Sequence, residues 1–174
     1  MTHPLYDATI PAFTRSLKAL DACLDKAQAH ADSLKCDVGN ILGSRLAPDM
    51  FPLSRQIQIA CDFAKSISSR MAGVEVPSFE DNEVTLADFK ARIAKTIAYI
   101  NTITPEQFEG SETRAISIPM RDGSKREYVG APYLHHAGLP NFYFHLTSAY
   151  TVLRHNGVQV GKKDFIGWAP PTYA

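Results

Sequence analysis

The sequence predicts an all-α protein, a four-helix bundle with one small β-hairpin between its third and fourth helices. Apolar side chains recur every three to four residues along four long segments, which places them on one face of a helix. One stretch near residue 120 instead alternates apolar and polar side chains around an Asp-Gly pair, as in two strands joined by a tight turn. The length of 174 residues predicts a single domain over residues 1–174.

The first helix is predicted over residues 10–31, where Pro11 suits the first turn. Its expected buried side chains are Phe13, Leu17, Leu20, Leu24 and Ala27. Residues 33–49 contain three helix breakers and predict a loop with a short helical turn over residues 38–42. The breakers are Gly39, Gly43 and Pro48.

The second helix is expected to begin near Asp49, which is a good N-cap residue, and to end at Gly73. Its apolar stripe is Leu53, Ile57, Ala60, Ala64, Ile67 and Met71. Residues 74–84 predict a solvated loop, and its acidic residues favour a role in solubility. These residues are Glu80, Asp81 and Glu83.

The third helix is predicted to begin after Thr85, because Asp88 three residues later completes a capping arrangement. It should end before Pro105, which starts a short turn. Residues 115–129 predict a two-stranded hairpin that turns at residues 122–123 and packs on the helices.

The fourth helix is predicted in two pieces. A first piece covers residues 131–137, a break follows at residues 138–140, and the main piece begins at Pro140 and runs to Asn156. Gly157 suits the left-handed residue that follows a helix end.

Two connections, residues 33–49 and residues 111–130, are long enough to cross the bundle rather than join antiparallel neighbours. A simple up-down-up-down order is therefore not assured by the pattern.

The composition argues against polyanion or membrane partners. Lys and Arg total 18, as do Asp and Glu, so no global field attracts nucleic acid or anionic lipid. Neither a signal core nor a membrane-spanning run occurs, which predicts a cytoplasmic protein. Three widely spaced cysteines fit neither a disulfide framework nor a zinc site and predict reduced thiols; they are Cys23, Cys36 and Cys61.

A polar stripe lies among the aromatic residues of the fourth helix. Asn141, His145 and Ser148 recur at i, i+4 and i+7, which places them on one face. His145 has two interpretations: a general base, because imidazole titrates near neutrality, or a core histidine hydrogen-bonded to Gln56 or Asn141.

Residues 144–158, Phe-His-Leu-Thr-Ser-Ala-Tyr-Thr-Val-Leu-Arg-His-Asn-Gly-Val, resemble the last-helix signature of the DinB/YfiT-like superfamily. In that signature two histidines four residues apart precede Leu-Arg and a closing Gly-Val. Together with residues 45–53 and 161–165, the chain resembles one branch, the domain-of-unknown-function family 1993 of bacteria and fungi. The resemblance implies a four-helix bundle in up-down-down-up order that is often dimeric.

Metal-binding members of the superfamily hold a divalent metal with one histidine of the second helix and two of the last. By this resemblance His145 matches one ligand, Asn141 stands where another would be, and Gln56 is the expected second-helix position. Two amides and one imidazole are a poor set for zinc or nickel, so we expect no tightly held metal and no cofactor. If a metal binds, His145 is its ligand, and Asp62 could add a carboxylate.

Three functions remain open at this point. The first is a protein that binds a small molecule in a polar cleft lined by Gln56, Asp62, Asn141, Tyr143 and His145. The second is a divergent metal-dependent enzyme of the DinB superfamily, of thiol-transferase or hydrolase-like type. The third is a structural or interaction homodimer, and a homodimer is also the expected assembly of the first.

Overall fold

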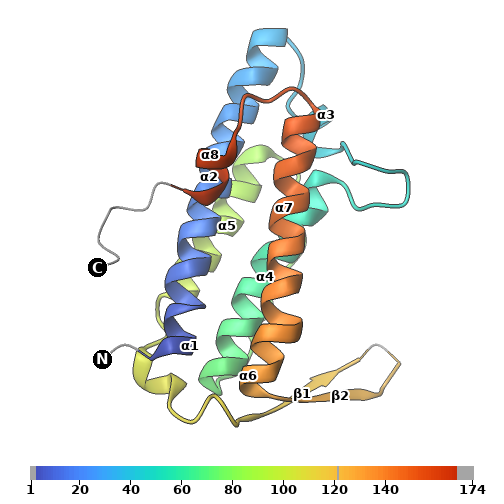
Figure 1. The fold of residues 1–174 in the computed structure, drawn as a ribbon. Helices are drawn as coiled ribbons and strands as arrows, with labels where there is room; N and C mark the ends of the chain where they lie inside the picture. The colour runs from blue at the N-terminus through green and yellow to red at the C-terminus, as the bar shows by residue number, and fades with distance from the viewer. Residues whose placement is uncertain (1–2, 121, 168–174) are drawn as a thin grey trace.

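The computed structural model describes residues 3–120 and 122–167. Four long helices lie along one common axis (Figure 1): α2 (Ile10–Leu34), α4 (Leu53–Ala72), α5 (Leu86–Ile100) and α7 (Leu139–His155). Shorter helical elements are α1 (Pro4–Asp7), α3 (Gly39–Leu42), the 3-10 turn η1 (Pro105–Phe108), α6 (Gly130–Tyr133), the π-helix η2 (Leu134–Gly138) and α8 (Lys162–Ile166). Strands β1 (Ala115–Pro119) and β2 (Lys125–Val129) form an antiparallel hairpin. The chain is thus mostly helical with one small hairpin, as the sequence predicts.

Contacts between the helices show that α4 and α5 run in the same direction. Arg92 Nη2 lies 2.9 Å from Asp62 Oδ1, and the Tyr99 hydroxyl lies 2.7 Å from Ser69 Oγ. Residue numbers therefore rise together along the two helices, which is the mark of a parallel pair.

The same reasoning places α2 antiparallel to α5. Lys90 Nζ of α5 binds Asp21 and Asp25 of α2, whereas Asn101, just past the end of α5, donates to Thr14 near the start of α2. Helix α7 in turn runs antiparallel to α4, so α2 and α7 share one direction and α4 and α5 the other.

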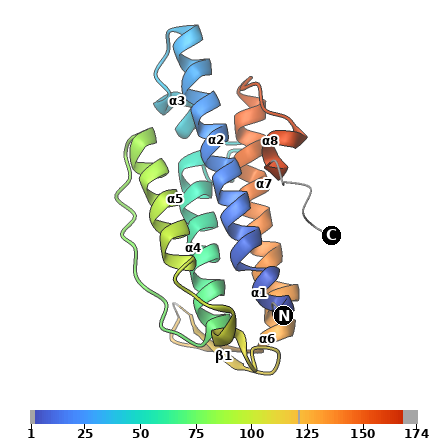
Figure 2. The same ribbon diagram turned by 90° about the vertical axis from the view of Figure 1, so that its left-hand side faces the viewer.

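Parallel neighbours need a connection that returns the full length of a helix. Helix α4 has 20 residues, so the chain between α4 and α5 must cover about 30 Å. Residues 73–85 do this in an extended path along the outside of the helices (Figure 2).

Two of the three acidic residues of that connection, Asp81 and Glu83, are bound to α5, so the connection is not only a solvated loop as expected. Arg92 Nη2 lies 2.9 Å from Asp81 Oδ1, and Arg92 Nη1 lies 2.8 Å from Glu83 Oε1. The side chains of Arg92 and Glu83 are 2% and 8% exposed. Pattern reasoning could not find these pairs because it assigned α5 only a buried apolar stripe.

The two long connections cross the helix assembly, as predicted. Helix α2 packs against α5 and α7, and α4 packs against the same two helices. The chain therefore passes from α2 to the diagonally placed α4, and later from α5 to the diagonally placed α7. The hairpin is part of this second crossing (Figure 1).

Two predicted helix ends are confirmed and one is wrong. Thr85 and Asp88 form the predicted capping box, and Gly73 ends α4 with φ at 70°. Asp49, however, does not cap α4, which begins at Leu53 after an extended Pro52. A residue that precedes proline is disfavoured in helical conformation, so the helix cannot begin before Pro52.

The predicted break at residues 138–140 is also wrong, because the chain stays helical there. The π-helix η2 leads directly into α7, and Pro140 lies in the first turn of α7. Pro140 has no backbone N–H, but this loss costs little in the first turn of a helix that follows a wider π-helical turn. The Asn141 side chain bonds to the preceding turn instead, because its Nδ2 donates a 2.7 Å hydrogen bond to the Ala137 carbonyl. Gly157 follows the helix with φ at 87°, as predicted.

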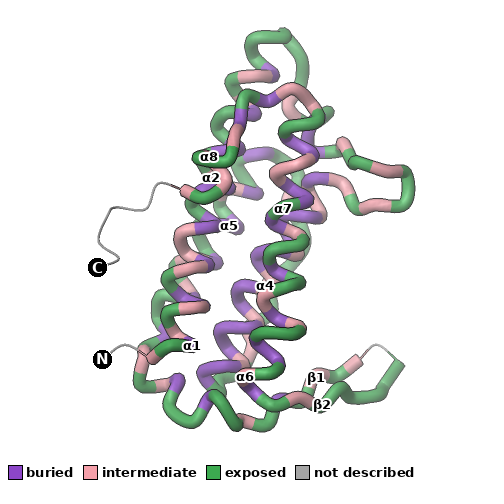
Figure 3. The backbone as a smooth tube through the Cα atoms, viewed as in Figure 1, coloured by how far each residue is buried: buried purple, intermediate pink, exposed green. Residues whose placement is uncertain are grey.

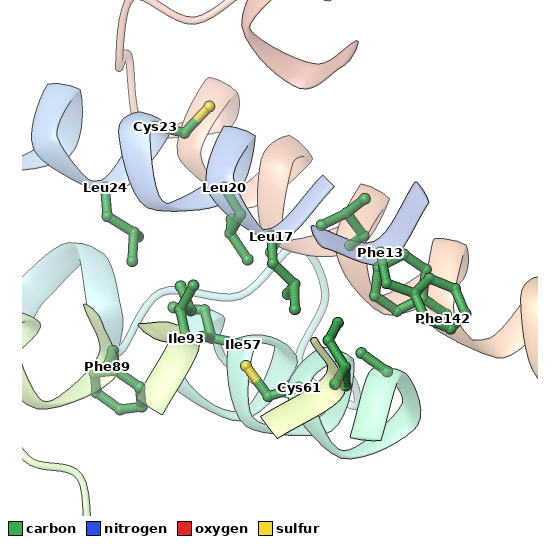
Figure 4. Packing of buried hydrophobic residues seen from close by; sticks show 14 of the residues in the cluster. Phe13, Leu17, Leu20, Cys23, Leu24, Ile57, Cys61, Phe89, Ile93 and Phe142 are labelled. Atoms are coloured by element: carbon green, nitrogen blue, oxygen red, sulfur yellow. The ribbon is translucent and has the colours of Figure 1, made fainter. Parts of the chain in front are cut away.

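The apolar core lies between the four long helices, whose inner faces are buried along their whole length (Figure 3). Figure 4 shows side chains of α2, α4, α5 and α7 that meet there. The fully buried aromatic residues are Phe13, Phe89, Phe108 and Phe142. Cys23 and Cys61 are buried in the same cluster, while Cys36 is exposed, and all three are free thiols.

Candidate functional site

His145 of α7 and Gln56 of α4 form a hydrogen bond between His145 Nδ1 and Gln56 Oε1, at 2.7 Å. The Gln56 side chain is oriented by a second bond, because its Nε2 donates to the Phe51 carbonyl at 3.2 Å. Gln56 is 1% exposed. Since Oε1 can only accept, Nδ1 carries the hydrogen, and the lone pair of the imidazole is at Nε2. No described residue forms a hydrogen bond with Nε2.

The environment keeps this histidine neutral. Phe63 stacks on its ring with centroids 5.6 Å apart, and Phe144 meets it edge-on at 5.1 Å. Burial lowers the pKa of His145 below its ordinary value, and the positive charge of Arg55 lowers this pKa further. At neutral pH the ring is therefore a hydrogen-bond acceptor through Nε2.

The structure separates the other expected site residues from this pair. Asn141 is exposed and donates to its own helix, one turn before His145. Tyr143 is 37% exposed and packs edge-on against Phe142. Asp62 is bound by Arg92 Nη2 and by Lys65 Nζ at 3.0 Å. The sequence thus placed Gln56 beside His145 correctly, but these five residues do not form one cluster.

A cleft of about 320 Å³ opens where α4, the hairpin and the α6–η2–α7 segment meet, and neither His145 nor Gln56 is among its described lining residues. Phe63 connects the two features, since one face of its ring stacks on His145 and its side chain also lines the cleft. The lining residues are Asp62, Phe63, Ser66 and Arg70 from α4, Ile118, Met120, Arg126 and Tyr128 from the hairpin and its turn, and Tyr133, Ala137, Gly138 and Asn141. Of the five expected site residues, Asp62 and Asn141 line this cleft, whereas Tyr143 does not.

Each wall follows from local sequence periodicity. On α4, residues 62, 66 and 70 are four apart and form one stripe. In the hairpin, Ile118 pairs directly with Arg126, and Ile116 pairs with Tyr128, so these side chains share one face of the sheet. Sequence reasoning missed the hairpin wall and Arg70. The alternation around residues 116–128 was the signal for the hairpin wall, since it marked one face as directed to the helices.

The described residues do not fit the divalent metal site of the superfamily. His145 is the one strong donor among the three matched positions, and Gln56 Oε1 is engaged by His145 itself. Asp62 is already bound by two cationic side chains. Over residues 3–120 and 122–167, no cluster of three or more His, Cys, Asp or Glu side chains is arranged to hold a metal.

A family model described as a domain of unknown function, DUF1993, matches residues 5–166. The chain belongs to the DUF1993 family. It is also similar to a crystal structure of a DinB family member protein from Shewanella denitrificans, with 44% sequence identity and a TM-score of 0.90. That match covers 98% of this chain and 95% of the other, so the resemblance to DinB proteins is confirmed. Among curated proteins, none matches the chain.

The described helices of this DUF1993 protein include none that is both long and apolar enough to cross a membrane. Its longest helix, α2, carries Lys and Asp side chains on its outer face, as expected for a helix that meets water on one side.

Proposed function

We propose that this DUF1993 protein binds a small organic molecule in the cleft beside His145 and holds no tightly bound metal. The proposed scaffold is a DinB-type four-helix bundle in up-down-down-up order, formed by α2, α4, α5 and α7. The observation that carries the proposal is the cleft itself, because its volume of about 320 Å³ is large enough for a small ligand.

The lining has the chemistry of a ligand site. Phe63, Tyr128 and Tyr133 offer aromatic surface, while Ser66 and Asn141 offer hydrogen-bonding groups on two different walls. Pockets for small molecules combine such apolar walls with a few polar groups that fix orientation. The π-helix η2 forms part of the wall, and π-helical turns are frequent at functional sites.

Cleft binding is tested by two-dimensional amide NMR of the labelled protein against a fragment library. We expect shifts at residues of α4, the hairpin and η2. Ser66→Phe, which fills the cleft, should abolish them, whereas Ser54→Phe on the same helix but outside the cleft should not. Fragments that shift the same signals in Ser66→Phe would refute binding in the cleft. Stoichiometric metal in protein purified without an affinity tag and dialysed would refute the metal-free site.

A second candidate function is catalysis, and it is favoured by the state of His145. A neutral imidazole with a fixed Nδ1–H and an available Nε2 lone pair can accept a proton. This candidate corresponds to a hydrolase-like or thiol-transferase enzyme of the superfamily. It predicts that a turnover signal found with any substrate disappears in His145→Gln while ligand binding in the cleft remains.

A third candidate is an interaction homodimer, favoured by exposed aromatic surface beside the site. Phe144 is 58% exposed and Phe51 is 54% exposed. A second copy of the chain is the partner we propose for this surface, in a cytoplasmic protein. Light scattering after size exclusion should give twice the chain mass, and Phe144→Ser should reduce it if this surface is the interface.

A further inference from the structure

We propose that the cleft selects organic anions, and specifically carboxylates with an aromatic or branched apolar body, through Arg70 and Arg126. This inference rests on the proposed function, since it names the class of ligand for the same cleft. It follows from a charge imbalance among the described lining residues, which include two arginines and one carboxylate that is already paired with other cations.

Arg70 differs from Arg55 and Arg92, the other two arginines of α4 and α5. Arg92 binds three carboxylates and Arg55 binds Asp81. Arg70 is half-buried and donates from Nη1 to the Tyr133 hydroxyl at 3.3 Å, with no carboxylate within ion-pair distance among the residues that the structure describes. Partly buried charges are normally matched by an opposite charge. A ligand carboxylate would supply that charge.

Arg126 lines the same cleft from the hairpin. It pairs across the strands with Ile118, and both line the cleft. Hydrogen bonds from Ser124 lower the pKa of the nearby Asp122 carboxyl, and the charge of Arg126 makes only a smaller contribution to this shift. Within the described part of the chain, Arg126 also has no ion-pair partner.

Among the described lining residues Asp62 is the only carboxylate, and it cannot balance the two arginines. Asp62 Oδ1 lies 2.9 Å from Arg92 Nη2 and 3.0 Å from Lys65 Nζ, so its charge is already offset. The described lining of the cleft therefore carries an excess of positive charge, contributed by Arg70 and Arg126. A guanidinium prefers a planar carboxylate because it can donate two parallel hydrogen bonds to it.

The apolar side chains of the lining define the rest of the ligand. Phe63, Ile118, Tyr128 and Tyr133 form apolar surface, and the rings of Tyr128 and Tyr133 pack on each other with centroids 5.4 Å apart. Burial raises the pKa of Tyr133, so its hydroxyl stays protonated. The site thus fits a molecule with an apolar body and one carboxylate.

The probes are phenylacetate and its neutral isostere phenylacetamide, titrated into the full chain and followed by amide NMR. We expect phenylacetate to bind at least about tenfold more tightly, as a charge-assisted hydrogen bond implies. Arg70→Gln and Arg126→Gln should each remove most of this preference. Lys125→Gln is the matched control, since it removes an equal charge from the neighbouring position on β2, whose side chain points to the other face of the sheet.

The outcomes separate this inference from the proposed function. Equal affinity for both probes, at signals that Ser66→Phe abolishes, would refute selection of anions and leave the binding cleft intact. Failure of both probes would refute the carboxylate class, while the fragment library tests the cleft independently. If Lys125→Gln reduces the preference as much as Arg126→Gln, the effect is one of overall charge and the inference is wrong. Because Arg126 is exposed, its variant tests the proposal even if Arg70→Gln fails to fold.

Discussion

His145 Nδ1 donates a hydrogen bond to Gln56 Oε1, and this 2.7 Å contact joins α7 to α4 beside the cleft. Gln56 is almost completely buried, so its amide oxygen has no access to water as a substitute partner. The bond therefore has two consequences: it stabilises the pairing of the two helices, and it fixes which imidazole nitrogen is available at the site.

The first prediction concerns replacement of His145. His145→Leu leaves Gln56 Oε1 without a donor and should lower the free energy of unfolding by about 1–3 kcal/mol. His145→Gln keeps a donor of similar reach and should cost clearly less. Urea unfolding of both variants measures the difference. When Gln56 is already replaced by leucine, His145→Leu should lower the free energy of unfolding by less than it does in the wild type. An equal loss in the two backgrounds would show that the hydrogen bond contributes nothing to stability.

A second prediction follows from the lowered pKa of His145. At pH values between the folded-state pKa and the ordinary pKa of about 6.5, His145 is protonated to a greater extent in the unfolded chain than in the folded one. This contribution to stability is thus complete above about pH 6.5 and is lost as the pH falls through the folded-state pKa. Urea midpoints from pH 7.5 to 5 should therefore fall more steeply for wild type than for His145→Gln. Parallel curves would contradict the prediction.

The third prediction concerns the thiols. Burial raises the pKa of Cys23 to about 11 and that of Cys61 to about 12, whereas Cys36 is exposed. A thiol reagent at pH 8 should label Cys36 alone in the native protein and all three cysteines after unfolding without reductant. Cys36→Ser should abolish the native reaction. A pair missing from the denatured count would indicate a disulfide and contradict the predicted reduced state.

The helices were predictable because the apolar period of α2, α4 and α5 is regular and their ends carry local signals such as the Thr85 capping box. The π-helix was not predictable in the same way. Gly138 and Pro140 signal a break by local preference, but the π-helix continues directly into α7. A glycine suits this position because an added Cβ would lie 3.3 Å from the Ile67 side chain.

The site was partly predictable for the same reason. Gln56 and His145 were placed together by resemblance, and their contact is observed. Arg70 and Arg126 were missed, because a cleft wall formed by one helix and a distant hairpin depends on how the second crossing connection lies. No periodicity within one segment contains that information.

The fourth prediction tests the left-handed residue after α7. Gly157 has φ at 87°, and an added Cβ would lie 3.2 Å from His30 Nε2. Gly157→Ala should cost about 1 kcal/mol or more, because L-residues with a side chain disfavour this backbone region. Gly43→Ala is the control, since Gly43 has φ at −79° and its Cβ would make only ordinary contacts. A melting temperature that falls equally in both variants would contradict the role of the backbone at Gly157.

The last prediction compares two cations of α5 that differ in burial. The Arg92 side chain is 2% exposed and binds Asp62, Asp81 and Glu83. Arg92→Met leaves the buried Glu83 without a cationic partner, whereas Asp62 keeps Lys65 and Asp81 keeps Arg55. Removing one member of a buried ion pair typically costs about 3–5 kcal/mol.

Lys90, two residues earlier, binds Asp21 and Asp25 but is 28% exposed, so Lys90→Met should cost no more than about 1 kcal/mol. Arg92→Met should also release residues 73–85 from α4 and α5. Limited proteolysis should then cut this connection faster in Arg92→Met than in Lys90→Met under conditions where both are folded. Equal losses of stability together with equal cleavage rates would mean that the connection is held by its backbone path and not by Arg92.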